Sequence, residues 1–361
     1  MLQSGEYLIS STLWVRRSNI TVDGAWPWPV LRRSVGFTQE LMYTDSGSNP
    51  SWVTIRNIYF DGNRYNGATS TSFELNLYGC SYCMVTGNAL FISSPYFALG
   101  TDNTKPQAVT YVNLQGLEYL GIYTSNGGTQ CSDASGWSPS RCLNVSNSWF
   151  YSIGVNAIGF DLNNALIAYN SFNYNHTKCL FGAPGGQIDL DTGSNDVLVQ
   201  NNSFTNGPSC PNDFWAVGVE LHGSNIALVD NVIQNNTGEG IYMEGVHNIS
   251  VSSTNPSAYP ISNNNERGHG YNGCWGFPAI RIHTMTGKPQ SETITISNLW
   301  LTAGQSYGVE ASACRTGSGP PVLGLTVQNN CVAGNLVGGL YLPAAWYPAL
   351  SNNQTSGCGG Y

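Results

Sequence analysis

Short stretches of alternating apolar and polar residues recur along the chain, and polar turns separate them. One recurring pattern is apolar-x-apolar-x, as in Phe160-Asp-Leu-Asn, Ile188-Asp-Leu-Asp, Val219-Glu-Leu-His, Ile241-Tyr-Met-Glu and Ile280-Arg-Ile-His. A second pattern follows a turn and ends at asparagine, as in Val197-Leu-Val-Gln-Asn-Asn202 and Ile226-Ala-Leu-Val-Asp-Asn231. Strict alternation with a period of two predicts β-strands rather than helices.

The repetition of this pair of strands predicts a stack of similar coils. The spacing between coils is irregular, but asparagine ends the second strand each time. A β-sandwich also contains many short strands, yet it has no repeated two-strand pattern with asparagine at one fixed corner. The sequence therefore predicts an all-β, parallel β-solenoid, in which stacking buries the apolar faces that no single repeat could bury alone.

No internal boundary interrupts the repetition, so we expect a single domain over residues 1–361. Residues 1–24 would form the N-terminal first coil. Residues 125–141 and 252–278 have the polar composition of loop insertions, and residues 343–361 would form a C-terminal cover.

Composition and charge narrow the possible partners and the compartment. The net charge is −8 and the 13 lysines and arginines are scattered, which disfavours a nucleic-acid partner. The sequence contains no run of 18 apolar residues, so it predicts no transmembrane span. The ten cysteines favour disulfides and therefore a secreted protein. We expect the local bridges Cys131–Cys142 and Cys179–Cys210, although the sequence leaves the connectivity open.

The N-terminal stretch Ser4-Gly-Glu-Tyr-Leu-Ile-Ser…Ile20-Thr-Val-Asp-Gly24, with the asparagine-cornered coils that follow, resembles the pectate-lyase-like superfamily. The resemblance covers nearly the whole chain and implies a right-handed parallel β-helix. The superfamily includes polysaccharide lyases, glycoside hydrolases, esterases and phage tailspikes, so the resemblance is specific for the fold and weak for the activity.

Alignment of the first strand of each coil gives two rows of polar positions. One row reads Asp161, Asp189, Glu220, Tyr242, Arg281 and Glu310, and the next reads Asn163, Asp191, His222, Glu244, His283 and Ser312. We expect both rows on one outward surface, because stacked strands lie about 4.8 Å apart and alternate side chains about 6.6 Å apart. A solvated sheet face would carry serine, threonine and asparagine. Stacked like charges are unfavourable instead, so their presence indicates a functional site.

Paired carboxylates point to glycoside hydrolysis, and Asp189, Asp191, Glu220 and Glu244 are the acid/base candidates. Inverting hydrolases separate the two carboxyl groups by about 6.5–9.5 Å, and retaining ones by about 5–5.5 Å. Asp189 with Asp191, or Asp191 with Glu244, fits the longer distance, whereas Asp189 with Glu220 fits the shorter one. We favour inversion because the ladder offers more pairs at the longer spacing.

The remaining polar residues and nearby aromatic residues of this surface are expected to bind substrate. Imidazole and guanidinium groups would position the sugar or tune the carboxylates, and tryptophans in neighbouring loops would stack on sugar rings. The predicted substrate-binding residues are His222, Arg281, His283, Tyr242, Trp215, Trp275 and Asp161.

Two other functions fit the same residues. A polysaccharide lyase would eliminate across a uronate, with Ca²⁺ held by Asp189, Asp191 and Glu220 and with Arg281 beside it. This order loosely resembles the calcium-dependent pectate lyases, although their Trp-Ile-Asp-His-type stretch is absent. A non-catalytic glycan-binding or adhesion solenoid is the third possibility. The hydrolase prediction requires no cofactor.

The layout also resembles the polygalacturonase-like hydrolases, which carry Asn-x-Asp, Asp-Asp, Gly-His-Gly and Arg-Ile-Lys on successive coils. Asp189-Leu-Asp191 would match the first motif, Glu220 the second, and Arg281-Ile-His283 the last. Asp189 stands in place of asparagine, no Asp-Asp pair follows, and His283 replaces lysine. The resemblance therefore implies a polysaccharide substrate more firmly than it implies that family's catalytic set.

Overall fold

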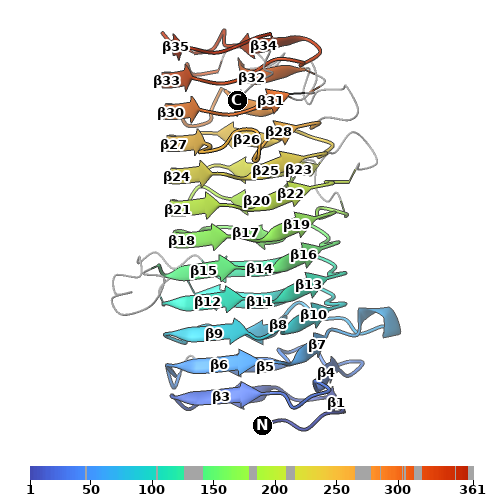
Figure 1. Cartoon of the computed structure of the whole chain (residues 1–361). Helices are drawn as coiled ribbons and strands as arrows, with labels where there is room; N and C mark the ends of the chain where they lie inside the picture. Colours follow the sequence, from blue (N-terminus) through green and yellow to red (C-terminus); the bar gives the residue numbers. More distant parts are fainter. Residues whose placement is uncertain are drawn as a thin grey trace. The chain divides into compact units, whose positions relative to one another are not determined.

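The computed structural model is a right-handed parallel β-helix in which every sheet is parallel (Figure 1). The only helical element in the described ranges is one 3₁₀ turn, η1 (Arg64–Asn66). Two compact units, Met1–Ser171 and Phe172–Tyr361, divide the chain. The single-domain organisation stays a prediction. The structure describes residues 1–44, 47–102, 105–125, 141–178, 185–208, 216–264, 278–284, 286–302, 304, 306–312, 319–345 and 347–356.

The first unit, drawn from blue to green in Figure 1, contributes three sheets, each with one strand from every coil. The first sheet contains β1 (Glu6–Ile9), β4 (Val30–Arg33), β7 (Tyr59–Asp61), β10 (Leu90–Ile92), β13 (Asn113–Gln115) and β16 (Trp149–Tyr151). The second contains β2 (Leu13–Val15), β5 (Met42–Thr44), β8 (Phe73–Asn76), β11 (Phe97–Asp102), β14 (Leu120–Ser125) and β17 (Ile158–Gly159). The third contains β3 (Ile20–Asp23), β6 (Val53–Arg56), β9 (Cys83–Thr86), β12 (Gln107–Thr110), β15 (Leu143–Ser146) and β18 (Asn163–Ala168).

The second unit repeats this arrangement. Its first sheet contains β19 (Ser171–Asn173), which starts at the last residue of the first unit, then β22 (Ser203–Thr205), β25 (Val232–Gln234), β28 (Ile261–Ser262) and β31 (Leu301–Thr302). Its second sheet contains β20 (Gly185–Leu190), β23 (Ala216–Leu221), β26 (Ile241–Glu244), β29 (Ile280–His283), β32 (Tyr307–Ser312) and β34 (Gly338–Tyr341). Its third sheet contains β21 (Asn195–Gln200), β24 (Ser224–Val229), β27 (His247–Ser252), β30 (Glu292–Ser297), β33 (Leu323–Gln328) and β35 (Ala349–Ser351).

Columns of identical or similar apolar residues hold the coils together. In the third sheet of the second unit, each inward residue pairs with the equivalent residue of the next coil, in the order Val199, Leu228, Val251, Ile296 and Val327. All five are buried. β-Branched and leucine side chains suit such columns because they fill a pleated, fully buried surface. The alternation in the sequence therefore predicted these strands correctly.

Asparagine occupies the corner after the third-sheet strands, as the sequence predicts. Asn201, Asn298 and Asn329 have left-handed φ angles of 53°, 54° and 55°, a conformation that asparagine tolerates well. The next asparagine in the turn points inward and bonds its neighbour, since the Asn202 Nδ2 donates to the Asn231 Oδ1 at 3.0 Å. Stacked side-chain amides thus satisfy buried polar groups at the corner.

Strands lie within three of the segments that the sequence delimits. Residues 1–24 form one coil, with β1, β2 and β3. The range 252–278 is not wholly an insertion, because β28 lies within it; two residues are too few to show an alternating pattern. In 343–361, β35 pairs with β33 and adds a further strand to the sheet.

The described cysteines are all in disulfides. Cys80 and Cys83 are bridged to each other, a pair that the sequence did not lead us to predict. Cys142 is also disulfide-bonded, as expected, but its predicted partner Cys131 lies outside the described residues, as do Cys179 and Cys210. Among the described residues, no helix has the length and apolarity needed to cross a membrane.

Candidate active site

The predicted ladder forms on the second sheet of the second unit. Asp189 pairs with Glu220, Glu220 with Tyr242, Tyr242 with Arg281, and Arg281 with Glu310. This is the order obtained by aligning the sequence, so the expected register is confirmed. Parallel pairing in register brings the carboxylates of successive coils into neighbouring positions.

The ladder is less exposed than a solvated sheet face. Asp189, Asp191 and His222 are half-buried, whereas Arg281 and Glu310 are only 2% and 3% exposed. Tyr242, Glu244 and His283 are buried as well. Both rows are therefore largely covered over the C-terminal coils, and the accessible end of the ladder is the one that carries Asp189, Asp191 and His222.

Asp161 does not join this ladder. Asp161 was placed in a strand spanning Phe160–Asn163, but β17 covers only Ile158–Gly159 and Phe160 has a left-handed φ of 82°. Asp161 therefore follows the strand and lies in the first unit. The sequence pattern misled because two apolar residues, Phe160 and Leu162, happen to alternate there. Trp215 and Trp275 lie outside the described residues.

Glu220 pairs with Asp189 across neighbouring strands and is only 5% exposed. One carboxylate oxygen accepts the Gly186 N–H at 3.1 Å, and the other is 2.9 Å from the His222 Nε2. A side chain at Gly186 would lie 2.1 Å from the Ile188 carbonyl oxygen and 3.0 Å from the Glu220 Cβ, so only glycine fits beside the carboxylate.

His222 completes an ion pair with Glu220. Burial lowers the pKa of His222, but the hydrogen bond to Glu220 and the nearby charges of Glu220, Asp189 and Glu244 outweigh it and raise the pKa to about 9. His222 is therefore an imidazolium at neutral pH, and its protonated Nε2 donates to Glu220. Its side chain is 19% exposed, so it also borders the accessible space.

Glu244 is the centre of a second polar cluster. It accepts hydrogen bonds from the Tyr242 hydroxyl at 3.0 Å and from the His283 Nδ1 at 2.9 Å, and it pairs with the Lys288 ammonium at 2.8 Å. Burial raises the pKa of Glu244, but these three partners lower it to about 2. A carboxyl group held so firmly in its charged form is a poor proton donor.

Arg281 pairs with two buried carboxyl groups, Glu239 in the corner before β26 and Glu310 in β32. Its Nε bonds Glu239 at 2.6 Å and its Nη1 bonds Glu310 at 2.9 Å, with all three side chains nearly inaccessible. Burial raises the pKa of Glu239, although the charge of Arg281 opposes this. These contacts give Arg281 a structural role beside two buried carboxyl groups, and its contact with substrate stays a prediction.

Asp191 lies one residue beyond β20. Its Oδ1 accepts its neighbour's backbone N–H, that of Thr192, at 2.7 Å, and its side chain is half-buried. The charge of Asp191 also helps to raise the pKa of Lys288, after the larger contribution from the hydrogen bond to Glu244. Asp191 thus borders the accessible end without joining the Glu220 hydrogen bonds.

One group of residues has metal-ligand spacing. Single donor atoms of Asp189, Glu220 and His222 all lie within 4.8 Å of one another. The predicted Ca²⁺ set differs, since it contained Asp191 instead of His222. Ca²⁺ takes oxygen ligands, whereas imidazole suits transition metals and zinc, so the chemistry of this donor set fits the latter ions better.

Sequence reasoning missed Glu239 and Lys288. Glu239 comes from the corner before β26, and Lys288 from the turn after β29. Neither lies on the aligned strand positions. Their signal was weak: each is a lone charge in a chain with 9% charged residues, preceded by glycine in Gly238-Glu239 and Gly287-Lys288.

Known structures share this fold at low sequence identity. No protein-family model and no curated protein matches the sequence. The chain is similar to the A-module of mannuronan C-5 epimerase AlgE6 from Azotobacter vinelandii, with a TM-score of 0.56 and 14% identity over 99% of this chain and 90% of that one. The fold is the right-handed parallel β-helix.

Two further structures support the same assignment. The periplasmic alginate epimerase AlgG matches with a TM-score of 0.56 and 13% identity, covering 96% of this chain and 78% of that one. The catalytic unit of a GH87 α-1,3-glucanase from Streptomyces thermodiastaticus matches with a TM-score of 0.54 and 12% identity over all of this chain and 64% of that one. At such identities the likeness establishes the fold, as the superfamily resemblance implied.

Proposed function

We propose that this protein is a polysaccharide-cleaving glycoside hydrolase whose reactive pair is Asp189 and Glu220. The observation that carries the proposal is their meeting across adjacent strands, within 4.8 Å of each other and of His222. Two carboxyl groups in reach of one sugar are the minimum set for cleaving a glycosidic bond. A solved structure of the same fold is a glucanase, so this fold can support glycoside hydrolysis.

The charge of the site favours hydrolysis over elimination. Four carboxylates, Asp189, Asp191, Glu220 and Glu244, outnumber the two cations Lys288 and His222, the latter protonated because its pKa is about 9. Hydrolysis passes through a positively charged, oxocarbenium-like state, which negative groups stabilise. Elimination from a uronate builds negative charge instead. The acidic site therefore supports a substrate with neutral sugars at the cleavage point.

The roles of the two carboxyl groups follow from their surroundings. Glu220 accepts hydrogen bonds from the Gly186 N–H and from protonated His222, so it would act as the carboxylate that faces the sugar carbon. Asp189 is half-buried and lies beside Glu220 on the neighbouring strand, so it is the proposed acid. Their short separation supports a retaining mechanism, in place of the inversion favoured from the sequence.

The remaining residues would support this pair. His222 would hold Glu220 in place through their hydrogen bond, and Asp191 and Lys288 border the accessible space where substrate would bind. Glu244 holds Tyr242 and His283 in one orientation and is not proposed as an acid. We therefore propose that Tyr242 and His283 form a wall behind the reacting groups and do not contact the substrate directly.

A panel of polysaccharides incubated with the protein tests the proposal. We expect new reducing ends from at least one neutral polysaccharide, and near-complete loss of them with Asp189→Asn or Glu220→Gln. Equal activity of both variants and the unaltered protein would refute the assignment of the pair. Binding to a polysaccharide without any product would support a non-catalytic glycan-binding solenoid.

Metal-assisted chemistry on a uronate is the second candidate, favoured by the donor set Asp189, Glu220 and His222. A divalent metal there would reduce the negative charge of the site and could neutralise a substrate carboxylate. Two solved structures of similar fold are epimerases of mannuronan and alginate. Loss of activity on chelation, with recovery on adding Zn²⁺, Mn²⁺ or Ca²⁺ separately, would favour this candidate and identify the ion.

We also propose that the protein is secreted, with a polysaccharide or oligosaccharide as its partner. The disulfide between Cys80 and Cys83 and the bonded states of Cys142 and Cys331 support an oxidising compartment. We expect to detect the protein outside the cytoplasm of its source cells. Its disulfide-bonded cysteines should not react with an alkylating reagent unless they are first reduced.

A further inference from the structure

A cavity of about 490 Å³ lies in the first unit and shares no residue with the candidate active site. Its volume is in the range of small-ligand pockets, about 300–1,000 Å³. Polar, charged, aromatic and small apolar side chains line it together, and they are Arg64, Tyr65, Ala68, Thr69, Ser70, Pro95 and Glu118.

The cavity is built at one corner of three successive coils. Its main wall is η1, which stands out from the strands in Figure 1 and connects β7 to β8. Pro95 connects β10 to β11, and Glu118 connects β13 to β14. Backbone hydrogen bonds fix these connections, since the Arg64 N–H donates to the Ser93 carbonyl and the Glu118 N–H to the Ser94 carbonyl.

The turn at η1 has backbone features that fix its shape. Asn63 and Gly67, on either side of it, both adopt left-handed φ angles, of 58° and 81°. The Gly67 N–H donates back to the Arg64 carbonyl and closes the turn. Two left-handed residues bracketing three residues hold Arg64 and Tyr65 at the rim of the cavity.

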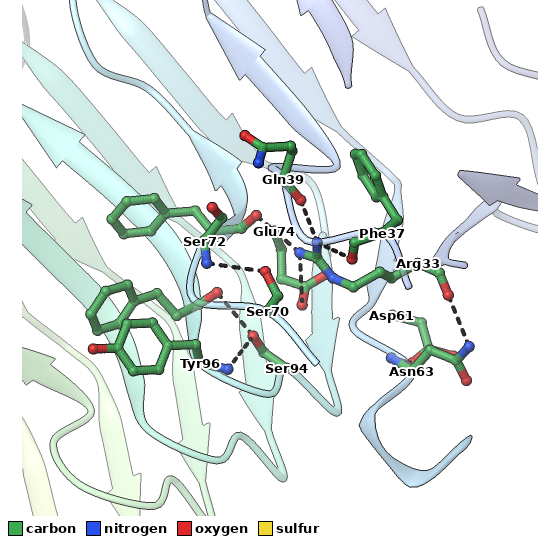
Figure 2. A network of polar contacts seen from close by, with 12 residues as sticks. Arg33, Phe37, Gln39, Asp61, Asn63, Ser70, Ser72, Glu74, Ser94 and Tyr96 are labelled. Carbon is green, nitrogen blue, oxygen red and sulfur yellow. Dashed lines mark hydrogen bonds and ion pairs between the residues drawn. The ribbon is translucent and has the colours of Figure 1, made fainter. Parts of the chain in front are cut away.

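Beneath the cavity, buried polar groups anchor the loop that follows η1. Figure 2 shows Ser70, Ser94 and Tyr96 beside the buried pair Arg33 and Glu74. The Ser70 hydroxyl donates to the Thr38 carbonyl at 2.8 Å. It also accepts the N–H of Ser72, two residues further on. Ser70, which lines the cavity, is thus held in place by two hydrogen bonds.

Tyr65 provides an exposed aromatic ring at this rim. The ring is 72% exposed, yet its hydroxyl accepts a hydrogen bond from the Arg64 Nη2 at 2.6 Å. The Arg64 guanidinium carbon also lies 4.6 Å from the ring centroid. An aromatic ring that is accessible and already held in place loses little freedom when a sugar stacks on it.

The charges of the cavity balance. Arg64 donates to the Glu118 Oε2 at 2.6 Å, so one cation and one carboxylate neutralise each other among the lining residues. A uronate would have to compete with Glu118 for the guanidinium, whereas a neutral sugar could accept and donate hydrogen bonds without separating the pair. Charge balance therefore selects against an acidic ligand.

We propose that this cavity binds a neutral sugar unit of a polysaccharide, with Tyr65 as the stacking platform and the Arg64–Glu118 pair as its hydrogen-bonding edge. The site belongs to the first unit and acts independently of catalysis. It would hold the polymer on the protein, and its existence does not depend on the proposed hydrolase activity.

Affinity electrophoresis of the full chain tests this proposal. The protein carries Glu220→Gln throughout so that no probe is cleaved, and the gels contain a neutral glucan, mannan, galactan or xylan, or polygalacturonate. We expect at least one neutral probe to retard the protein, and Tyr65→Ala to weaken its association about tenfold, since stacking is worth about 1.4 kcal/mol. Tyr65→Phe should retain most of the binding.

Tyr111→Ala is the matched control, because Tyr111 is also exposed in the first unit and does not line the cavity. It should migrate as the parent does. The proposal is overturned if no neutral probe retards the parent, if only polygalacturonate does, or if Tyr65→Ala and Tyr111→Ala behave alike. Thermal unfolding of each variant separates lost binding from lost folding.

Discussion

The second sheets of the two units carry opposite chemistry on equivalent strands. In the first unit, rings pack on one another: Phe97 stacks with Phe73 at 5.0 Å between centroids and with Tyr123 at 5.1 Å. In the second unit, the aligned row is Asp189, Glu220, Tyr242, Arg281 and Glu310. The same backbone repeat thus supports an aromatic surface or an ionic one.

The difference shows what each kind of row requires. Rings stack without further partners, and Gly100, which pairs with Tyr123, leaves room for Phe73, whose ring carbons would lie 3.1 Å from an added Cβ. Charges need partners from outside the row: Glu239 and Lys288 come from corners to pair with Arg281 and Glu244. An ionic row therefore demands more specific loops than an aromatic one, a cost that suggests it is retained for chemistry.

The largest expected effect is on catalysis in the ionic row. Glu220→Gln should lower kcat/KM by about 10³-fold or more, because the amide cannot take the negative charge that the reaction requires. The measurement is the rate of reducing-end formation. Glu292→Gln is the matched control, since Glu292 also bonds a histidine, His247, at 2.9 Å but is exposed. Similar losses in both variants would contradict the assignment.

The next effect is on stability in the same row. Arg281→Met should lower the free energy of unfolding by about 3–5 kcal/mol, because Glu239 and Glu310 would remain buried without their cation. Urea denaturation measures this change. Adding Glu239→Gln and Glu310→Gln to Arg281→Met should restore much of the loss. A small loss for the single variant would show that the arginine is not needed for neutralisation.

The first unit also contains a buried ion pair, Arg33 and Glu74. The pH dependence of stability that Glu74 produces can be compared with that of the ionic row. Burial raises the pKa of Glu74 to about 7 from an ordinary 4.5, with the charge of Arg33 opposing the shift. Because the folded protein holds this proton more tightly, the stabilisation is complete below about pH 4.5 and is lost as the pH rises through about 7. The loss is up to roughly 3 kcal/mol.

Glu74→Gln should flatten this dependence between those pH values. Urea denaturation at a series of pH values measures it. The two profiles would coincide if Glu74 were ionised throughout in the folded protein. Such a result would mean that Arg33 and Glu74, the buried pair drawn in Figure 2, are both charged throughout this pH range.

The smallest effect concerns His222. Its pKa of about 9, raised by Glu220 against the effect of burial, means that activity should fall as the pH rises through about 9. The ion pair's stabilisation is complete below the ordinary pKa of 6.5 and is lost over the same upper range. His222→Gln should lower kcat about tenfold and remove this alkaline limb. An unchanged pH profile in the variant would exclude the histidine as its source.

Much of the fold could be predicted from the sequence because it depends on local repetition. Alternation predicted the strands, asparagine predicted the corners, and alignment of the coils predicted the pairing of Glu220 with Tyr242 and of Arg281 with Glu310. Each of these features repeats along the chain. A pattern that is weak in one coil is therefore supported by the coils on either side.

Features that do not repeat escaped prediction. The strand β28 is only two residues long, too short to show alternation. Phe160 has a left-handed φ, so the strand ends before Asp161 and Asp161 does not occupy a ladder position. Burial of Arg281 depends on Glu239, which lies 42 residues away in the chain. The location of the carboxylate pair could be predicted from the sequence, but the protonation partners of each carboxylate could not, because they come from irregular corners.

The products formed from a polysaccharide panel test the central claim most directly. Each reaction is followed both for new reducing ends and for the ultraviolet absorbance of an unsaturated uronide. Hydrolysis by Asp189 and Glu220 predicts reducing ends without that absorbance, and their disappearance in Glu220→Gln but not in Glu292→Gln. Reducing ends accompanied by the absorbance would contradict hydrolysis and show that the same ionic row performs elimination.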